Sequence, residues 1–294
     1  MATFFQTLIT GLADGSVYAS LALALVLIYK ATEVINFAQG EMAMFTTYIA
    51  CTLQTHHALG YWWAFAVTLA IAFVGGFGVE RLVIRPLERT SVLTVVMATI
   101  ALLVILQGLA GWIWSPQIQF FPSPFPTSSW VIGSVHVSKQ DVGTFGVTLG
   151  CVLVLWAFFR FTKLGLAMRA GALNPAAARL LGVRTGWLLA LGWGFAAALG
   201  AVCGMMVAPT IFLQPTMMDA VLIYAFAAAV LGGLESPVGA VVGGLALGVL
   251  LALLAQYVHF VTAELQLPVA LLVLLAVLLV RPAGIFGRVV VRRV

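Results

Sequence analysis

The sequence predicts an all-α polytopic membrane protein, with eight or nine transmembrane segments, pseudo-repeated halves and broken helices. Composition is the first reason: 63% of the 294 residues are hydrophobic, only 8% are charged and the mean hydropathy is +1.14. A soluble domain carries roughly a quarter charged residues. The second reason is that the apolar runs are about twenty residues long and lack strand-like alternation, which favours helices over barrel strands.

The apolar segments follow one another along a single transmembrane domain, residues 1–294. The N-terminal run has no basic start and is too long for a signal peptide, so we expect a retained first span. Near the C-terminus, "LESPV" alone separates two segments, which form either two spans or one broken, re-entrant element. With nine crossings the N-terminus lies outside. The predicted segments are 6–29, 38–54, 61–80, 92–113, 143–161, 187–209, 219–233, 238–256 and 267–281.

Charge placement predicts the sides of the membrane. Basic residues cluster in three connecting regions and are sparse elsewhere, which makes these regions and the C-terminus cytoplasmic and argues against nucleic-acid binding. The proline-rich loop at about 114–142 is then external. The basic clusters are Arg81, Arg85 and Arg89; Arg160, Lys163, Arg169, Arg179 and Arg184; and Arg281, Arg288, Arg292 and Arg293.

Neither a metal site nor a cofactor site is expected. The three cysteines, Cys51, Cys151 and Cys203, lie inside apolar runs without the short spacings of a metal or disulfide framework. The sequence also lacks a Walker A loop, a zinc-binding HExxH motif and a nucleophile elbow, so we expect no enzymatic activity in this chain.

Two polar, glycine-containing breaks interrupt the apolar sequence. "NFAQGE" lies in the N-terminal half and "VLGGLESPVGAVVGG" in the C-terminal half, each with one carboxylate. Transporters place their pathways at such discontinuities in corresponding positions of two halves, and carboxylates are costly against lipid. The alternative is a pair of ordinary turns outside the hydrocarbon. The candidate pathway residues are Asn36, Phe37, Gln39, Gly40, Glu41, Gly232, Gly233, Glu235 and Pro237.

The cytoplasmic loop at about 162–186 predicts a short helix capped at both ends. Asn174 suits the N-cap, Pro175 the first helical position and Gly182 the C-terminal stop. A two-turn helix is marginal by itself, so its apolar residues need a surface. That surface is either the bilayer interface or a cytosolic partner.

Three segments together resemble the LivH-type permeases, the membrane subunits of ATP-binding-cassette importers for branched-chain and other hydrophobic amino acids. They are "VINFAQGEMAM", "GLAMRAGALNPAAARLLGV" and "YAFAAAVLGGLESPVGAVVGG", in the family's order across nearly the whole chain. The resemblance implies a bacterial inner-membrane protein that works by alternating access. Its implied partners are a LivM-type permease, two cytosolic ATPases, which hydrolyse the ATP, and a periplasmic binding protein. It makes the loop helix an ATPase coupling helix, carried by Arg169, Asn174, Pro175, Ala177, Arg179, Leu180, Leu181 and Gly182.

Departures from the family pattern argue against a proton-linked role at Gln39, and the cargo stays open because members of the group also serve urea, amides and aromatic acids. Gln39 stands where the family commonly has histidine, and Glu235 where it usually has glycine. In the loop, Leu166 and Ala177 replace charged residues and Asn174 replaces aspartate, which makes the expected ATPase contact more apolar. Other functions consistent with the breaks are an ion- or proton-coupled secondary transporter using Glu41 and a channel constricted at "NFAQGE". A stand-alone carrier does not need the capped loop helix.

Overall fold

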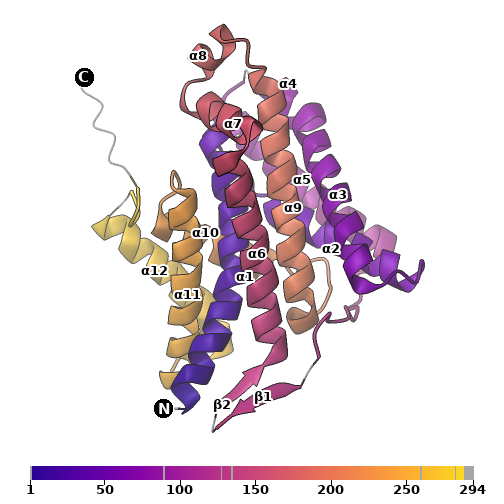
Figure 1. Cartoon of the computed structure of the whole chain (residues 1–294), viewed down its shortest axis with the longest axis vertical. Helices are drawn as coiled ribbons and strands as arrows, with labels where there is room; N and C mark the ends of the chain where they lie inside the picture. Colours follow the sequence, from indigo (N-terminus) through magenta and orange to yellow (C-terminus); the bar gives the residue numbers. More distant parts are fainter. Residues whose placement is uncertain are drawn as a thin grey trace.

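The computed structural model describes residues 2–287 except 89, 127, 134, 259 and 282. The predicted cytoplasmic residues Arg89, Arg288, Arg292 and Arg293 lie outside the described residues. The fold is a helical bundle with one small antiparallel hairpin (Figure 1). Its elements are α1 (Ala2–Thr32), α2 (Gln39–Thr55), α3 (Tyr61–Val79), a π-helical turn (Glu80–Ile84), α4 (Arg85–Leu87), α5 (Val92–Trp114), β1 (Ser129–Ile132), β2 (Val135–Ser138), α6 (Lys139–Phe161), α7 (Lys163–Leu173), α8 (Pro175–Leu180), α9 (Thr185–Ile211), α10 (Asp219–Gly232), α11 (Pro237–Tyr257), a 3-10 turn (Ala263–Leu265) and α12 (Gln266–Val280).

Each predicted apolar segment coincides with a helix, which confirms the all-α class. In the described residues, six helices are long and apolar enough to cross a membrane, namely α1, α3 with its extension to Leu87, α5, α6, α9 and α11. Helices α10 and α12 are apolar but shorter, and α2 has only 17 residues. The segments separated by "LESPV" are two helices, α10 and α11, joined by a short turn. Eight or nine crossings therefore stays a prediction.

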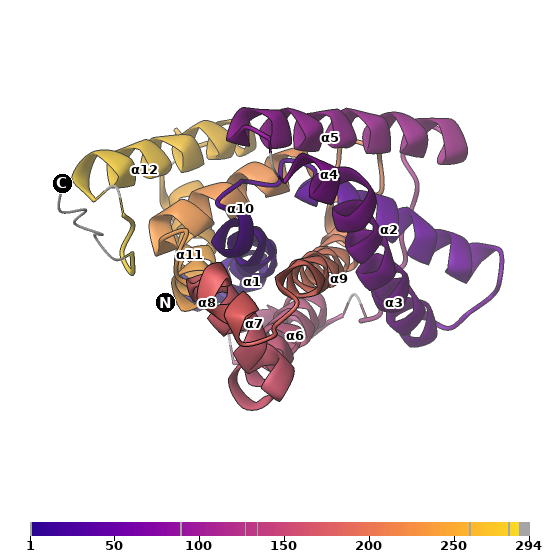
Figure 2. The same cartoon turned by 90° about the horizontal axis from the view of Figure 1, so that it is seen from above.

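Helix α1 runs through the centre of the bundle, enclosed by α6, α9, α10 and α11 (Figure 2). It packs antiparallel to α11 at very short range, because glycines meet backbone atoms there. A Cβ on Gly248 would lie 2.3 Å from the Gly15 Cα, and one on Gly244 would lie 2.4 Å from the Ala19 backbone nitrogen. Small residues at four-residue spacing on α11, Gly244 and Gly248, allow this close helix approach.

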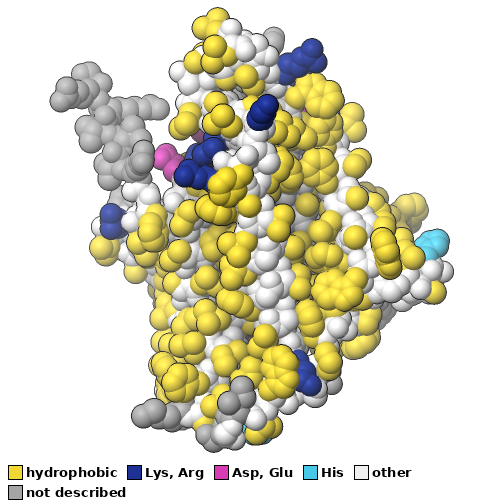
Figure 3. Space-filling view, in the orientation of Figure 1, with side chains coloured by type: hydrophobic (Ala, Val, Ile, Leu, Met, Phe, Trp, Pro, Cys, Tyr) yellow, Lys and Arg dark blue, Asp and Glu magenta, His cyan; other side chains and the backbone are white. Residues whose placement is uncertain are grey.

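The two ends of the bundle differ in charge. Helices α4, α7 and α8 gather at one end, while the start of α1 and the β1–β2 hairpin lie at the other (Figure 1). The first end carries Arg85, Lys163, Arg169 and Arg179 from these helices. The sides of the bundle between the ends are largely hydrophobic (Figure 3). This distribution matches a protein whose middle lies in hydrocarbon.

The π-helical turn after α3 was not predicted from the sequence. It holds Glu80, which is fully buried, with its Oε2 atom 3.8 Å from the Arg81 Nε atom. The Arg81 guanidinium lies 4.5 Å from the ring centre of Trp187, near the start of α9. The cation–π contact of Arg81 thus links the turn after α3 to α9.

The contact between α1 and α11 yields a stability prediction. Gly248→Val should lower the free energy of unfolding by about 1–3 kcal/mol or more, because the new methyl groups have no space beside Gly15. Thermal unfolding in detergent, followed by tryptophan fluorescence, measures the change. Gly75→Val on α3 is the control, since its Cβ would meet open space. Equal losses in both variants would contradict the close packing of α1 on α11.

Candidate functional site

The segment between α1 and α2 is a helix break held together by an amide side chain. Asn36 is fully buried, and its Oδ1 atom accepts a hydrogen bond from the Ala38 backbone N–H at 3.1 Å. Its Nδ2 atom donates to Gln39 Oε1 at 3.2 Å. The side chain therefore satisfies a backbone donor that the interrupted helix leaves free. Phe37, between these polar residues, is half-buried.

Gln39 fixes the break against α9. Its Nε2 atom donates to the Ala196 backbone oxygen at 2.8 Å, part way along that helix. A Cβ on Gly200 would lie only 2.8 Å from the same Nε2 atom, so glycine keeps this hydrogen bond accessible. On the other side, a Cβ on Gly40 would lie 3.3 Å from the Cβ atoms of Met218 and Leu222. The break is thus wedged between α9 and the start of α10.

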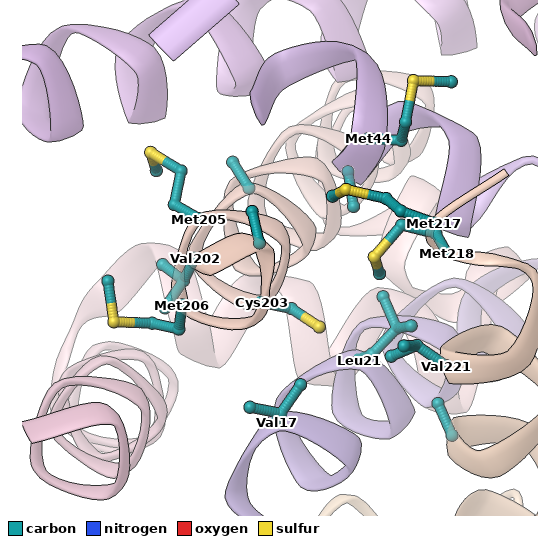
Figure 4. Close-up of a cluster of buried hydrophobic side chains, with 14 of the residues drawn as sticks. Val17, Leu21, Met44, Val202, Cys203, Met205, Met206, Met217, Met218 and Val221 are labelled. Atoms are coloured by element: carbon teal, nitrogen blue, oxygen red, sulfur yellow. The ribbon is translucent and has the colours of Figure 1, made fainter. Parts of the chain in front are cut away.

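A methionine-rich cluster surrounds this region. Figure 4 shows Met44 of α2, Cys203 of α9 and Val221 of α10 packed with their neighbours in one apolar core. Met217 and Met218, directly before α10, belong to the same core. Unbranched methionine side chains fill irregular gaps and adapt to changed shapes. The helix break therefore lies beside a deformable apolar core.

Glu41 lies in the first turn of α2 and is almost fully buried, with its Oε2 atom lacking a hydrogen-bond partner among the described residues. The start of α10 packs against the neighbouring Gly40, and its first residue, Asp219, brings a second carboxyl group close to Glu41. Asp219 itself is exposed. Two helices thus begin side by side, each with an acid in its first turn, where the helix dipole favours negative charge.

Asp219 is the residue that reasoning from the sequence missed. The sequence drew attention to Glu41 and Glu235, one in each break, but the structure places Glu235 in an exposed turn between α10 and α11. The sequence signal was the unusual shortness of the segment that begins at Asp219, which marks a helix starting away from the membrane surface. Pairing across the bundle depends on tertiary structure that local sequence does not contain.

The glycine-rich segment of the C-terminal half forms a close turn. Gly233 has φ +103°, and the Ser236 Oγ atom accepts the Gly239 N–H at 3.0 Å, capping α11 with Pro237 in its first turn. The Gly232 carbonyl accepts a hydrogen bond from the Phe286 N–H at 3.1 Å. These contacts tie the turn to the segment after α12. A pathway role for Gly232, Gly233, Glu235 and Pro237 stays a prediction.

The predicted loop helix exists as α8. The Asn174 Oδ1 atom accepts the Ala177 N–H at 3.0 Å, and Gly182 has φ +79° at the other end. Leu180 is 90% exposed and Leu181 is 84% exposed, so two large apolar side chains project from the end of the bundle. Exposed apolar side chains that gather in one place mark candidate contact surfaces.

Of the other predicted coupling residues, some lie on the exposed helix α8 and one, Arg169, lies on α7 beside a groove. Ala177 is exposed, and the Arg179 Nε atom donates to the Thr185 hydroxyl at 3.0 Å. Arg169 lies instead on α7, a helix that the sequence did not predict, and is half-buried. The predicted set therefore does not form one continuous surface. Leu180 and Leu181 face outward, whereas Arg169 lines a groove on the side of the bundle.

Comparisons with known proteins identify the family of this chain. The family model described as the permease component of the branched-chain amino acid transport system matches residues 7–280. The chain is 32% identical to the LivH high-affinity branched-chain amino acid permease of Escherichia coli K12, over 99% of this chain and 98% of that protein. Identity to the BraD permease of Pseudomonas aeruginosa is also 32%, with the same coverage. A probable LivH permease of Methanocaldococcus jannaschii is 30% identical over 91% of this chain and 87% of that protein.

The pairing of Glu41 with Asp219 yields a second prediction. Glu41→Ala and Asp219→Ala should show a coupling energy above about 0.5 kcal/mol in a double-mutant cycle, since interacting residues are not additive. Glu41→Gln should destabilise less than Glu41→Ala, because the amide fills the same space and can donate to Asp219. Thermal unfolding in detergent supplies all the values.

The control cycle pairs Glu41→Ala with Glu235→Ala. Glu235 lies in the exposed turn and should add to Glu41 without coupling. Coupling of Glu41 to Glu235 but none to Asp219 would reject the junction of α2 and α10 described above.

Proposed function

This chain belongs to the family of permease components of branched-chain amino acid transport systems, and from that premise we propose that it forms half of an importer's translocation pathway. It is a multi-pass membrane transport subunit rather than a catalyst. ATP hydrolysis then belongs to two cytosolic ATPase subunits, and capture of cargo to an external binding protein. Few polar groups line the helices of this chain, so cargo affinity resides mainly in that binding protein.

The observation that carries the proposal is the meeting of two helix starts inside the bundle. Helix α2 begins beside the middle of α9, and α10 begins against it at Met218 and Asp219. Transporters place cargo sites where discontinuous helices from two halves meet. We take α2 and α10 as the corresponding elements of a pseudo-repeat. A hydrophobic amino acid offers an apolar side chain to the methionine-rich cluster and an ammonium group to Glu41 and Asp219.

The second permease, of LivM type, would cover the face formed by α5 and α10. Helix α5 lies at the edge of the bundle, on the far side of α1 from α6 and α7 (Figure 2). Its side chains are mostly exposed, including Met97, Val104 and Trp112. Helix α2 packs against both α5 and α10, and Asp219 is exposed at the start of α10. A pathway between two permease subunits needs such an unpacked face next to the broken helices.

The ATPase contact is assigned to α8. Leu180 and Leu181 project from the end that carries the basic residues, away from the rest of the chain. If these two leucines bind in a recess on an ATPase subunit, movement of the ATPases toward each other would be transmitted through α8 to the bundle. The secondary transporter and the channel are not favoured, because neither would use the exposed leucines of α8.

Cargo identity is tested by uptake into vesicles that hold the chain with its ATPase, second permease and binding protein. Leucine, isoleucine and valine should accumulate on addition of ATP, and a panel of amides and polar amino acids identifies related cargo. Uptake that ignores ATP but follows a proton gradient would replace the proposal with the secondary transporter. Glu41→Gln at normal yield should change uptake rate or cargo preference if the junction lines the pathway.

A third prediction addresses coupling in the same vesicles. Replacing both Leu180 and Leu181 with Asp should abolish transport-stimulated ATP hydrolysis, because two charges in an apolar contact cost several kcal/mol. Phosphate release measures the stimulation. Val131→Asp on the hairpin is the matched control, since Val131 is 63% exposed at the opposite end of the bundle. Normal stimulation in the double variant would remove α8 from the ATPase contact.

A fourth prediction concerns the sides of the membrane. We place the end with α4, α7 and α8 in the cytoplasm, and the start of α1 and the hairpin outside. A cytoplasmic C-terminus, which the charge distribution predicts, then requires an odd number of crossings such as nine. In sealed right-side-out vesicles, an impermeant thiol reagent should label Gln117→Cys and not Asn174→Cys. External labelling of Asn174→Cys would invert the arrangement and with it the coupling assignment.

A further inference from the structure

A deep groove opens on the side of the bundle away from the proposed pathway. It encloses about 610 Å³ between α1, α6, α7, α9 and α11. Its lining combines residues of α7 and α8 with apolar residues of α1, α6, α9 and α11. Because α5 and α10 carry the proposed pathway face, a second permease seated there leaves this groove uncovered.

The wall of the groove divides into an apolar part and a basic rim. The apolar part comes from α1, α6, α9 and α11 and includes Leu23, Leu149, Val152, Trp156, Leu189 and Val241. Four cations surround the upper part against a single acid, Glu88. They are Lys30 at the end of α1, Arg160 at the end of α6, Arg169 of α7 and Arg179 of α8.

The Arg169 side chain in this rim has a hydrogen-bond donor without an acceptor among the described residues. This donor is its Nε atom, which is buried. A guanidinium donor left unpaired in a low-dielectric site is costly, and the geometry of guanidinium suits the oxygens of phosphate. Leu173 and Leu180, by comparison, are apolar residues of the same loop and face outward. The excess of cations and the free Arg169 donor therefore favour binding of an anion at the rim.

We propose that the groove binds an anionic phospholipid, with its acyl chains on the apolar wall and its phosphate at the Lys30–Arg160–Arg169 rim. Basic pockets between membrane helices on the cytoplasmic side bind acidic headgroups, at about 1 kcal/mol for each cation near the surface. A free phosphate would use the rim but leave the apolar wall in water. A lipid satisfies both parts at once.

The site lies where a lipid can act on coupling. Arg169 is five residues before Asn174, the N-cap of α8, and Arg179 lies on α8 itself. A bound headgroup would hold α7 against the ends of α1 and α6. The proposal does not rest on the proposed cargo or on transport, since binding can be measured without either.

Trp156 provides a direct probe, because it lines the groove and is half-exposed. The full-length chain is placed in phosphatidylcholine nanodiscs, alone and with its co-expressed partner subunits. Brominated phosphatidylglycerol or brominated phosphatidylcholine is then added, and tryptophan quenching is measured. Subtracting the signal of the Trp156→Phe variant isolates this side chain. We expect half-quenching at a several-fold lower fraction of phosphatidylglycerol than of phosphatidylcholine.

Charge variants test the rim. Arg160→Gln and Arg169→Gln should each reduce the preference for phosphatidylglycerol by about fivefold, the ratio that corresponds to about 1 kcal/mol for one cation. Lys163→Gln is the matched control, since Lys163 is exposed on the same helix as Arg169 but does not line the groove. Unchanged preference in both rim variants overturns the proposal.

Three other outcomes would also overturn it. Equal quenching by both lipids would make the groove an ordinary lipid contact. Loss of quenching on addition of inorganic phosphate would assign the rim to a soluble anion. Quenching in the isolated chain that disappears in the assembled complex would show that a protein partner occupies the groove. Failure of uptake would leave all these readings unaffected.

Discussion

A helix that is interrupted within hydrocarbon must find partners for the backbone groups that the interruption releases, and this requirement organises the centre of the molecule. Asn36 satisfies the Ala38 N–H, and Gln39 carries the junction to the Ala196 carbonyl on α9. That hydrogen bond is possible only because Gly200 leaves space beside the Gln39 amide. The position of α2, the location of Glu41 and its approach to α10 all follow from this one arrangement.

The fold could be predicted to the extent that it depends on local sequence. Long apolar runs predicted the membrane helices, and the Asn174 cap and Gly182 stop predicted α8. The π-helical turn at Glu80 and helix α7 were not predicted. Both depend on packing: Arg81 of the π-helical turn lies over the Trp187 ring of α9, and a Cβ on Gly165 of α7 would lie 2.6 Å from the Phe158 carbonyl oxygen. Such contacts join residues whose local sequence is compatible with several structures.

The site shows the same division between local and tertiary information. Asn36, Gln39 and Glu41 attracted notice because polar groups are costly in an apolar chain, and the structure buries all three. Their surroundings could not be derived, since Asp219 becomes a neighbour of Glu41 only when α10 folds against α2. The sequence identifies polar residues that are too costly to face lipid, but only the folded structure shows which of these residues contact one another.

The packing of α1 also restricts where movement can occur. Glycines bring α1 and α11 into backbone contact, so these helices cannot slide past each other without clashes and must move as one body. Helices α6 and α7 form the opposite wall of the basic groove, and α7 leads into α8. A swing of α8 with the ATPases would therefore change the width of the groove. A lipid that fits one width better than the other would shift the balance between the two states, and the dependence of ATP hydrolysis on phosphatidylglycerol would report that shift.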